Sequence, residues 1–249
     1  MTDQNTKEIQ KLRSFLKQSS RAVVFTGAGI STESGVSDYR SKGGIWDRFQ
    51  PVTIQEFLAD EEKRREYWHR KKEMFTEMKD AKPNAGHEAI ARLEKLGKLI
   101  GVITQNIDGL HQMAGNQKVL ELHGTNRETI CLACARTGPF ESVYQRLLQG
   151  DEIPLCRDCR GFLKPNTISF GQALVVEVLN LAIEWARNSD LMLAVGSTLV
   201  VEPAASFPRL AKRAGANLVI INRDPTPLDS LADLVLHGTA GPILAEAIG

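Results

Sequence analysis

The chain has 249 residues, and its 31 basic against 30 acidic side chains give a formal net charge of +1. With 42% hydrophobic and 24% charged residues, it has the composition of an ordinary globular protein. This excludes an intrinsically disordered chain and argues against a nucleic-acid binder that relies on broad phosphate neutralisation. The length fits one large domain or a domain with a small satellite.

The first twenty residues are polar and helix-like, without the apolar segment or the cleavage site of a secretory signal. No apolar run approaches the roughly 18 residues that a membrane span requires. We therefore expect a cytoplasmic protein with no membrane contact. Structural disulfides are rare in that compartment, so the four cysteines need another explanation.

Short apolar runs recur along the chain and predict buried strands at residues 21–26, 99–104, 191–195 and 218–221, with a weaker one at 119–122. These runs are continuous, which is typical of parallel strands covered on both faces. Helices are expected between them, at residues 84–96, 175–188 and 204–214. The alternation predicts an α/β fold, a Rossmann-like parallel sheet with helices on both faces.

Two stretches interrupt this alternation. Residues 45–80 are charged and mostly helical, and residues 126–165 contain all four cysteines. We interpret them as a helical insertion and a zinc-ribbon module that pack together as a small lobe. The Rossmann-like body then consists of residues 1–44, 81–125 and 166–249.

The cysteines form two C-x2-C pairs, Cys131 with Cys134 and Cys156 with Cys159. Two thiolates at this spacing can point from one turn at one metal ion, and two such turns complete a tetrahedral zinc site. A redox pair or four unrelated thiols are the alternatives. Because a closed four-thiolate shell leaves no position for water, we predict one structural Zn²⁺ without a catalytic role.

A glycine turn, Gly27-Ala28-Gly29, follows the first expected strand. Such a turn lets the backbone and the next helix start approach a pyrophosphate. As a dinucleotide fingerprint it is imperfect, because Thr32 stands in place of the third glycine and the later acidic residue is missing. A dehydrogenase and a tight turn without a ligand both stay open on this evidence.

Further motifs make a specific resemblance. In order they are GVSDYRS (35–41), TQNIDGLH (104–111), ELHG (121–124), the paired cysteines, SFG (169–171), GSTLVVEPA (196–204) and INR (221–223). With the glycine turn, they resemble the sirtuin family of NAD-dependent protein lysine deacylases from about residue 20 to the C-terminus. The resemblance implies that NAD is a co-substrate: the acyl oxygen of an acylated lysine attacks C1′ of the ribose, nicotinamide leaves, and O-acyl-ADP-ribose forms.

The resemblance also implies the catalytic residues. His123 matches the family's general base for a ribose hydroxyl, and an imidazole suits this task because its ordinary pKa of about 6.5 lies near working pH. Asn106 would act beside it. On the residues alone, a satisfied histidine at a strand end is the alternative reading of His123.

The same resemblance assigns residues to NAD. Ile107 and Asp108 would line the nicotinamide pocket, with the Asp108 carboxylate accepting from the carboxamide. The remaining positions implied to contact NAD are Gly27, Ala28, Gly29, Thr32, Asp38, Tyr39, Arg40, Gln105, Asn106, Gly196, Ser197, Thr198, Asn222, Arg223 and Ala240.

Acylated lysine side chains of protein substrates are the implied partners. The substrate backbone would lie as an extra strand between residues 167–171 and 199–202. The positions assigned to it are Phe170, Gly171, Leu199 and Val200. Ser169 and Gln172 depart from the family pattern near this cleft, so the sequence does not define the peptide preference.

The acyl group is a separate question. Members that prefer acidic acyl groups have a Tyr-x-x-Arg pair in the helix corresponding to residues 61–75. One register places Trp68 and Lys71 at these positions, and a shift of one residue places Tyr67 and Arg70 there. We interpret the basic residues of this helix as a solvated face and predict deacetylation as the main activity; these residues are Lys63, Arg64, Arg65, Arg70, Lys71 and Lys72.

Other functions remain to be distinguished. A protein ADP-ribosyltransferase, or a deacylase with another acyl preference, could use the same site. Direct nucleic-acid binding by the cysteine module is not expected, because its arginines are balanced by acidic residues.

Overall fold

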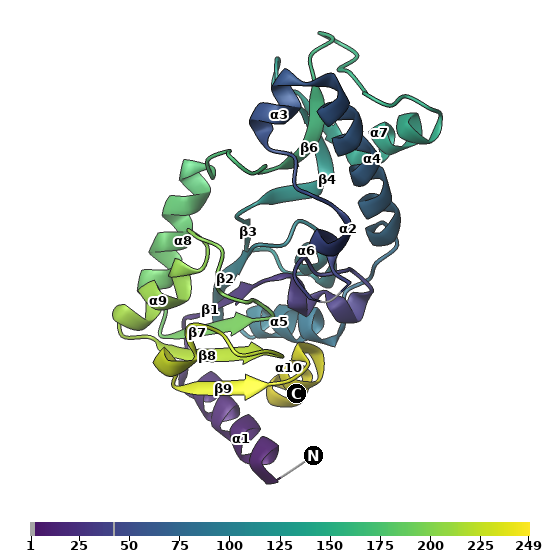
Figure 1. Ribbon diagram of the computed structural model, residues 1–249. Coiled ribbons are helices and arrows are strands. Elements are labelled where there is room, and N and C mark those ends of the chain that lie inside the picture. Colours follow the sequence, from purple (N-terminus) through teal and green to yellow (C-terminus); the bar gives the residue numbers. More distant parts are fainter. Residues whose placement is uncertain (1–2, 42) are drawn as a thin grey trace.

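The computed structural model describes residues 3–41 and 43–249, arranged around two sheets (Figure 1). The larger sheet has the strand order β3-β2-β1-β7-β8-β9, and all neighbouring strands are parallel. Its strands are β1 (Ala22–Thr26), β2 (Leu99–Thr104), β3 (Val119–Glu121), β7 (Leu191–Val195), β8 (Asn217–Asn222) and β9 (Leu234–His237). With its helices, this sheet confirms the predicted Rossmann-like α/β fold.

Helices cover both faces of the large sheet (Figure 1). Because successive strand side chains point to opposite faces, Val24 packs in one core with α1, α5 and α10, and Phe25 packs in the other with α8 and α9. Burial on both sides explains the continuous apolar runs. The helices of this body are α1 (Asp3–Gln18), α5 (Ala85–Lys95), α6 (Leu110–Ala114), α8 (Val176–Asn188), α9 (Ser206–Arg213) and α10 (Ala240–Ile248).

The three central strands end together. Thr26, the last residue of β1, is the register partner of Thr104 in β2 and of Val195 in β7. The chain passes from β1 to β2 on one side and reaches β7 on the other, so the strand order reverses at β1. In open α/β sheets, ligands bind at the carboxyl ends of the strands beside such a reversal.

The second sheet is antiparallel, with the order β5-β4-β6, and belongs to a small lobe. Its core contains Trp68 and Phe75 from α4 and Phe140 from α7, so the helical and the cysteine-containing segments share one core. The elements of this lobe are α2 (Ile45–Arg48), α3 (Ile54–Ala59), α4 (Glu61–Met78), β4 (Gly124–Cys131), β5 (Thr137–Pro139), α7 (Phe140–Leu148) and β6 (Leu163–Thr167).

Some elements were not expected from the sequence. The glycine turn leads into two short 3-10 turns, η1 (Ala28–Ile30) and η2 (Thr32–Ser34), where a longer helix start was expected. The sequence analysis also left α7, β9, α10 and the turn η3 (Asp229–Leu231) unassigned. Strand β9 has only four residues, so its pattern is too short to identify on its own.

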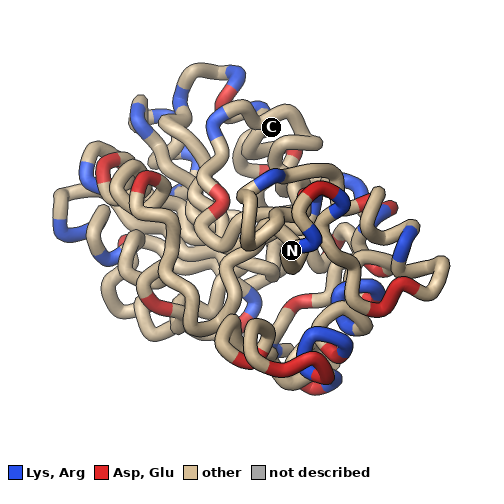
Figure 2. The backbone as a smooth tube through the Cα atoms, turned by 90° about the horizontal axis from the view of Figure 1, so that it is seen from above, with Lys and Arg blue, Asp and Glu red and all other residues tan. Residues whose placement is uncertain are grey.

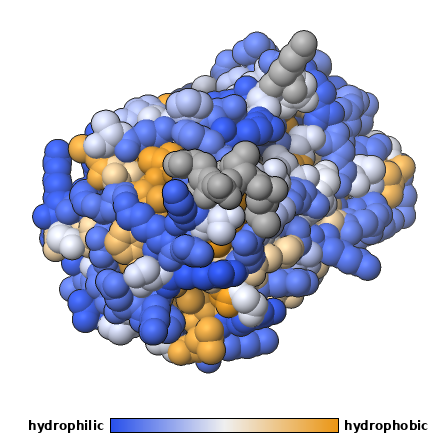
Figure 3. All heavy atoms as spheres, turned by 90° about the horizontal axis from the view of Figure 1, so that it is seen from below, coloured by the Kyte–Doolittle hydropathy of each residue, from blue (hydrophilic) through white to orange (hydrophobic). Residues whose placement is uncertain are grey.

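Among the described residues, no helix has both the length and the apolar character needed to cross a bilayer. The underside of the molecule shows apolar residues in small patches among hydrophilic ones (Figure 3). Basic and acidic positions are interspersed in the view from above (Figure 2).

Candidate active site

A cavity of about 820 Å³ lies between the carboxyl ends of the large sheet and the small lobe. The loops that follow β1, β2, β7 and β8 line one side of it, and residues of α4 and the segment after β6 line the other. The cavity therefore lies at the sheet edge where ligands of this fold class bind.

Most of the residues predicted for NAD and substrate come together here. The predicted residues that line this cavity are Gly27, Ala28, Gly29, Thr32, Asp38, Tyr39, Arg40, Gln105, Asn106, Ile107, His123, Phe170, Gly171, Gly196, Ser197, Thr198, Asn222, Arg223 and Ala240. Asp108 lines a smaller cavity of about 30 Å³, which adjoins the first because Ala28, Tyr39 and Asn106 line both.

Two residues predicted for the substrate lie elsewhere. The side chain of Leu199 is buried in the core with α8 and α9, and Val200 is 53% exposed outside the cavity lining. Leu199 has a left-handed backbone (φ 54°), and its N–H donates to the hydroxyl of Ser197 over 3.2 Å. This turn directs the Leu199 side chain into the core, where it is out of reach of a peptide in the cavity.

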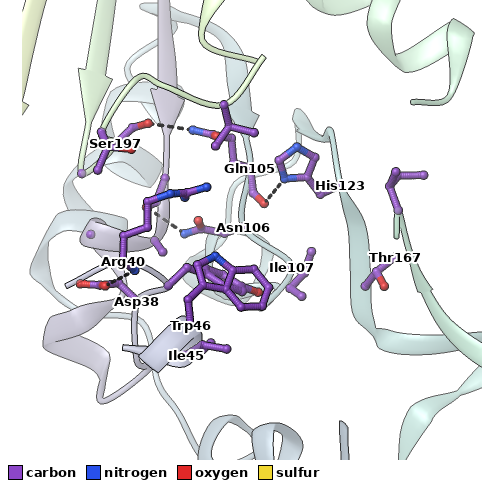
Figure 4. A pocket seen from close by; sticks show the side chains of 18 of the residues that line it. Asp38, Arg40, Ile45, Trp46, Gln105, Asn106, Ile107, His123, Thr167 and Ser197 are labelled. Carbon is purple, nitrogen blue, oxygen red and sulfur yellow. Dashed lines mark hydrogen bonds between the residues drawn. The ribbon is translucent and has the colours of Figure 1, made fainter. Parts of the chain in front are cut away.

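His123 follows β3 and faces the cavity (Figure 4). Its Nδ1 lies 3.0 Å from the main-chain oxygen of Gln105. A carbonyl oxygen only accepts, so Nδ1 bears the proton and Nε2 keeps its lone pair. Burial lowers the pKa of His123 below its usual value, and this outweighs the opposite effect of the Gln105 carbonyl. A neutral imidazole with a free Nε2 can act as a general base.

The loop after β2 presents two further polar side chains. Asn106, labelled in Figure 4, donates through Nδ2 to the Gly27 carbonyl over 3.1 Å. The same Nδ2 donates to the Ser31 hydroxyl over 3.1 Å. Asp108 accepts from the Ser31 hydroxyl over 2.8 Å and from the Leu110 N–H over 2.9 Å. These bonds hold a buried amide and a buried carboxylate at the junction of the two cavities.

The glycine turns after β1 and β7 interlock. A Cβ atom on Gly27 or on Gly29 would lie 2.8 Å from the Gly196 oxygen, and one on Gly196 would lie 2.3 Å from the Ile30 nitrogen. Gly196 also has a positive φ of 60°, which favours glycine. Close packing of the two turns therefore requires these glycines, and the same packing leaves their backbone at the cavity wall.

Asp38 organises the loop that contains Arg40. Its carboxylate accepts from the Arg40 N–H over 3.0 Å, and from the Ser41 N–H and hydroxyl over 2.8 and 2.6 Å. Burial raises the pKa of Asp38, but these hydrogen bonds outweigh it and the pKa is lowered. Arg223 donates to the Ser41 hydroxyl over 2.8 Å, which links the loop to the end of β8.

The sequence analysis missed Trp46. It lines the cavity between Tyr39 and Phe170, with ring centroids 5.1 and 5.7 Å away (Figure 4). The three rings form an aromatic wall. Trp46 begins the charged helical insertion, so its sequence context indicated a peripheral helix and gave no sign of a binding site.

The interpretation of the basic residues of α4 as a solvated face was wrong for three of them, because Arg64, Arg70 and Lys71 are buried. Their cationic groups donate to polar atoms inside the lobe: Arg64 to the carbonyls of Phe57 and Leu58, Arg70 to that of Gln50, and Lys71 to Oδ1 of Asn126. The sequence shows only that these residues are charged. It does not show which of them are buried by neighbouring segments.

The structure also resolves the register of α4. Tyr67, Arg70 and Lys71 line the cavity, whereas Trp68 lies in the lobe core against Phe140. Burial lowers the pKa of Lys71 to about 7, with further lowering from Arg70 and Lys164. The wall opposite the sheet therefore combines a phenol with two cationic groups.

The four cysteines converge in the small lobe. Their sulfur atoms all lie within 4.8 Å of one another, with 3.5 Å between Cys131 and Cys159 and 3.9 Å between Cys134 and Cys156. Tetrahedral zinc with Zn–S bonds of about 2.3 Å requires sulfur atoms roughly 3.8 Å apart. The four thiols fit one zinc ion, which argues against a redox pair or unrelated thiols.

The backbone has the same conformation after each of the two cysteine pairs. Ala135 follows the first pair and Arg160 the second, both with left-handed φ values, 58° and 62°. Each donates its N–H to the carbonyl of the first cysteine of its pair, over 2.9 and 3.0 Å. None of the four cysteines lines the cavity, so a zinc ion held here is structural.

Comparison with known proteins agrees with this site. The model of the Sir2 family matches residues 27–203. An NAD-dependent protein deacetylase of Thermodesulfovibrio yellowstonii is 46% identical, over 97% of this chain and 94% of that protein. One of Rhodopseudomonas palustris is 43% identical, over 97% of this chain and 96% of that protein.

Solved structures agree as well. A Sir2 enzyme structure is 42% identical with a TM-score of 0.88, over 97% of this chain and 96% of that one. A Sir2 variant with a deacetylated p53 peptide and 3′-O-acetyl ADP-ribose is 37% identical with a TM-score of 0.91, over 97% of both chains. The chain therefore belongs to the Sir2 family.

Proposed function

We propose that this protein is an NAD-dependent protein lysine deacetylase that consumes NAD and releases nicotinamide and O-acetyl-ADP-ribose. The observation that supports it best is His123, a neutral histidine whose proton is held on Nδ1 and which faces a cavity large enough for two substrates. The two bacterial relatives described above are named for this activity, and one neighbouring structure contains the acetylated nucleotide product.

The chemistry is attack of the acyl oxygen on C1′ of the nicotinamide ribose, with loss of nicotinamide. One water is then consumed as the lysine amine leaves and the acyl group stays on ADP-ribose. His123 accepts the proton of a ribose hydroxyl at Nε2, while the Gln105 carbonyl holds the protonated Nδ1. Asn106 is fixed beside it by Gly27 and Ser31. Its amide orients the ribose.

Nicotinamide binds in the smaller cavity in this proposal. Asp108 is 4% exposed there, and its Oδ2 accepts from Ser31. A carboxylate has about four lone-pair directions, so it can also accept from a carboxamide NH₂. Ile107 and Tyr39 enclose the ring and restrict the access of water.

The rest of NAD follows the ends of β1, β7 and β8. The interlocked glycine turns leave the backbone N–H groups of Ala28 and Gly29 near the pyrophosphate, and the Arg40 guanidinium supplies positive charge. The adenosine half lies between the turn after β7 and the residues Asn222, Arg223 and Ala240.

The acyl-lysine enters from the small-lobe side. Phe170 is 51% exposed, and the nearby N–H of Ile168 donates to the His123 carbonyl over 2.8 Å, so this segment leads directly to the catalytic histidine. A substrate peptide lies between residues 167–171 and the backbone of residues 199–202. Trp46 and Phe170 shield the lysine alkyl chain from water.

In this proposal the protein acts in the cytoplasm, its partners are acyl-lysines of other proteins, and it does not bind nucleic acid. The supporting observations are four free thiols suited to a reducing compartment and the mixed charges of Figure 2. In the cysteine module, Arg136 pairs with Asp158 over 2.7 Å, which neutralises one of its few basic groups.

The test uses NAD with an acetyl-lysine peptide and identifies the products by mass spectrometry. Free nicotinamide, deacetylated peptide and O-acetyl-ADP-ribose in equal amounts would support the proposal. Peptide that gains ADP-ribose would indicate a transferase, and NADH absorbance would indicate a dehydrogenase. Either result would contradict the proposed reaction.

A further inference from the structure

A chain of buried polar groups runs beneath the cavity from α6 to the loop after β2. Thr26 and Thr104 end neighbouring strands, and their hydroxyl oxygens lie 2.7 Å apart. The Thr26 hydroxyl also lies 3.0 Å from Nε2 of His111, and the Asn106 N–H donates to the Thr104 hydroxyl over 3.0 Å. His111, Thr26 and Thr104 are each at most 2% exposed.

The hydroxyl hydrogens determine the direction of this chain. At its far end, Nδ1 of His111 and Oδ1 of Asn116 have no hydrogen-bond partner among the described residues. Thr26 has one hydroxyl hydrogen and donates it to the Thr104 hydroxyl. Thr26 can therefore only accept from Nε2 of His111, which places the ring proton on Nε2.

The remaining hydrogens then follow. Nε2–H of His111 donates to the Thr26 hydroxyl, and the Thr26 hydroxyl donates to Thr104. The Thr104 hydroxyl oxygen has two lone pairs and accepts both from the Thr26 hydroxyl and from the Asn106 N–H. Burial lowers the pKa of His111 to about 3, so the ring stays neutral.

The end of this chain is the peptide unit that holds the proposed catalytic histidine. The N–H of Asn106 and the C=O of Gln105 belong to one planar peptide group. Thr104 binds the N–H side, and His123 Nδ1 binds the C=O side. A rotation of this plane would move the carbonyl that orients the His123 ring, and aligned hydrogen bonds polarise one another in a buried site.

We propose that His111 is a positioning residue, which acts through Thr26 and Thr104 to fix the Gln105–Asn106 peptide plane and thereby the ring of His123. His111 itself does not line the cavity, and neither do the two threonines. This inference rests on the proposed role of His123 as the base. It adds a buried relay that determines how precisely the base is held.

The first test examines the wild-type chain labelled with ¹⁵N-histidine, by NMR correlation of ring nitrogens with ring protons. The relay requires that His111 has a protonated Nε2, which donates to Thr26, and an Nδ1 without a proton. It also requires an exchange-protected Nδ1 proton on His123. A His111 ring protonated at Nδ1 would overturn the inference, whatever the enzyme activity proves to be.

The second test removes one hydroxyl with little change of shape. Thr104→Val leaves the Asn106 N–H without an acceptor, and Thr104→Ser retains the acceptor. The expected result for the valine variant is a fall in kcat of about tenfold or more, since small misplacements of a reacting group are costly. The KM for the peptide stays within about twofold, the Nδ1 proton of His123 exchanges faster, and serine restores both properties.

Ser189→Ala is the matched control, because Ser189 is 5% exposed and its hydroxyl donates to the Ala186 carbonyl over 2.8 Å, outside the cavity lining. Ser189→Ala should lower Tm by about as much as Thr104→Val does, without changing kcat. If Thr104→Val resembles this control in kcat and in His123 exchange, the relay does not position the base. If the wild type itself releases no nicotinamide, the proposed function fails, while the tautomer measurement still decides the relay.

Discussion

Nδ1 of His123 lies 3.0 Å from the carbonyl oxygen of Gln105, so the side chain of the proposed base is held by the backbone of the loop that also presents Asn106. The same β4 segment that follows His123 returns to this loop, where the N–H of Asn126 donates to the Ile107 carbonyl over 2.8 Å. Nε of Arg127 donates to the Asp108 carbonyl over 2.7 Å. The proposed base and the proposed nicotinamide end of the site are therefore built as one unit.

The lowered pKa of His123 predicts the pH dependence of activity. The reaction needs the neutral imidazole, and burial holds the pKa below the ordinary value of 6.5. Activity should therefore be full above pH 6.5 and fall only as pH decreases through the lowered pKa. The measurement is kcat/KM for an acetyl-lysine peptide between about pH 4.5 and pH 8.5. An acidic midpoint above 6.5 would show that His123 is not the base or is not buried as described.

The zinc site should support the small lobe without taking part in the reaction. Cys131 and Cys156 are buried, and both lie in the core that includes Trp68 and Phe140. Replacing both cysteines with serine should abolish zinc binding and expose residues 126–165 to limited proteolysis. Activity should fall indirectly, because β4 connects this lobe to the loop of Ile107 and Asp108. A zinc-free double variant with full activity would contradict this role.

We predict that acetyl-lysine is turned over faster than succinyl-lysine. Arg70 and Lys71 line the cavity, but Arg70 donates to the Gln50 carbonyl and Lys71 is only partly charged near neutral pH, since its pKa is lowered to about 7. Their attraction for an acidic acyl group is correspondingly reduced. The measurement compares kcat/KM for one peptide sequence with the two acyl groups. Faster turnover of the succinyl peptide would refute the acetyl preference.

Burial of Lys71 should reduce the stability of the folded chain. The unfolded lysine takes up a proton near its ordinary pKa of 10.5 and the folded one near 7. The penalty is therefore fully present below about pH 7 and disappears as pH rises toward 10.5. Lys71→Met, which keeps an apolar chain of similar length, should raise the free energy of unfolding at pH 7 by on the order of a few kcal/mol.

Urea unfolding at pH 7 and near pH 9.5 would test this effect. The gain from Lys71→Met should shrink at the higher pH, where most of the penalty is already absent. The control is Lys63→Met on the same helix, because Lys63 is exposed and its pair with Glu66 should contribute little. Equal effects of the two substitutions at both pH values would argue against a buried cation at Lys71.

Patterns of local spacing predicted most of the fold and the zinc ligands. The apolar runs at 21–26, 99–104 and 191–195 correspond to the three central strands, because burial on both faces leaves a continuous pattern. The two C-x2-C pairs converge because each pair forms a self-contained turn. The resemblance to sirtuins supplied the predicted NAD-binding positions, most of which line one cavity.

The features that depend on tertiary packing could not be predicted. The burial of Arg64 and Lys71 in α4 is determined by neighbouring segments, so a charged sequence looked solvent-exposed. Leu199 has a left-handed backbone, which directs its side chain into the core. The sequence does not indicate this conformation. Trp46 joins the cavity wall only because Tyr39 and Phe170 approach it from other segments.

The central claim is most directly tested by nicotinamide release from NAD in the presence of an acetyl-lysine peptide. Wild type should release nicotinamide in step with deacetylation, and His123→Ala should reduce kcat by at least about a hundredfold, the lower range for general-base catalysis. His69→Ala, at an exposed histidine on α4, should match the wild type. If His123→Ala and His69→Ala both retained wild-type rates, His123 would not be the base and the proposed mechanism would be wrong.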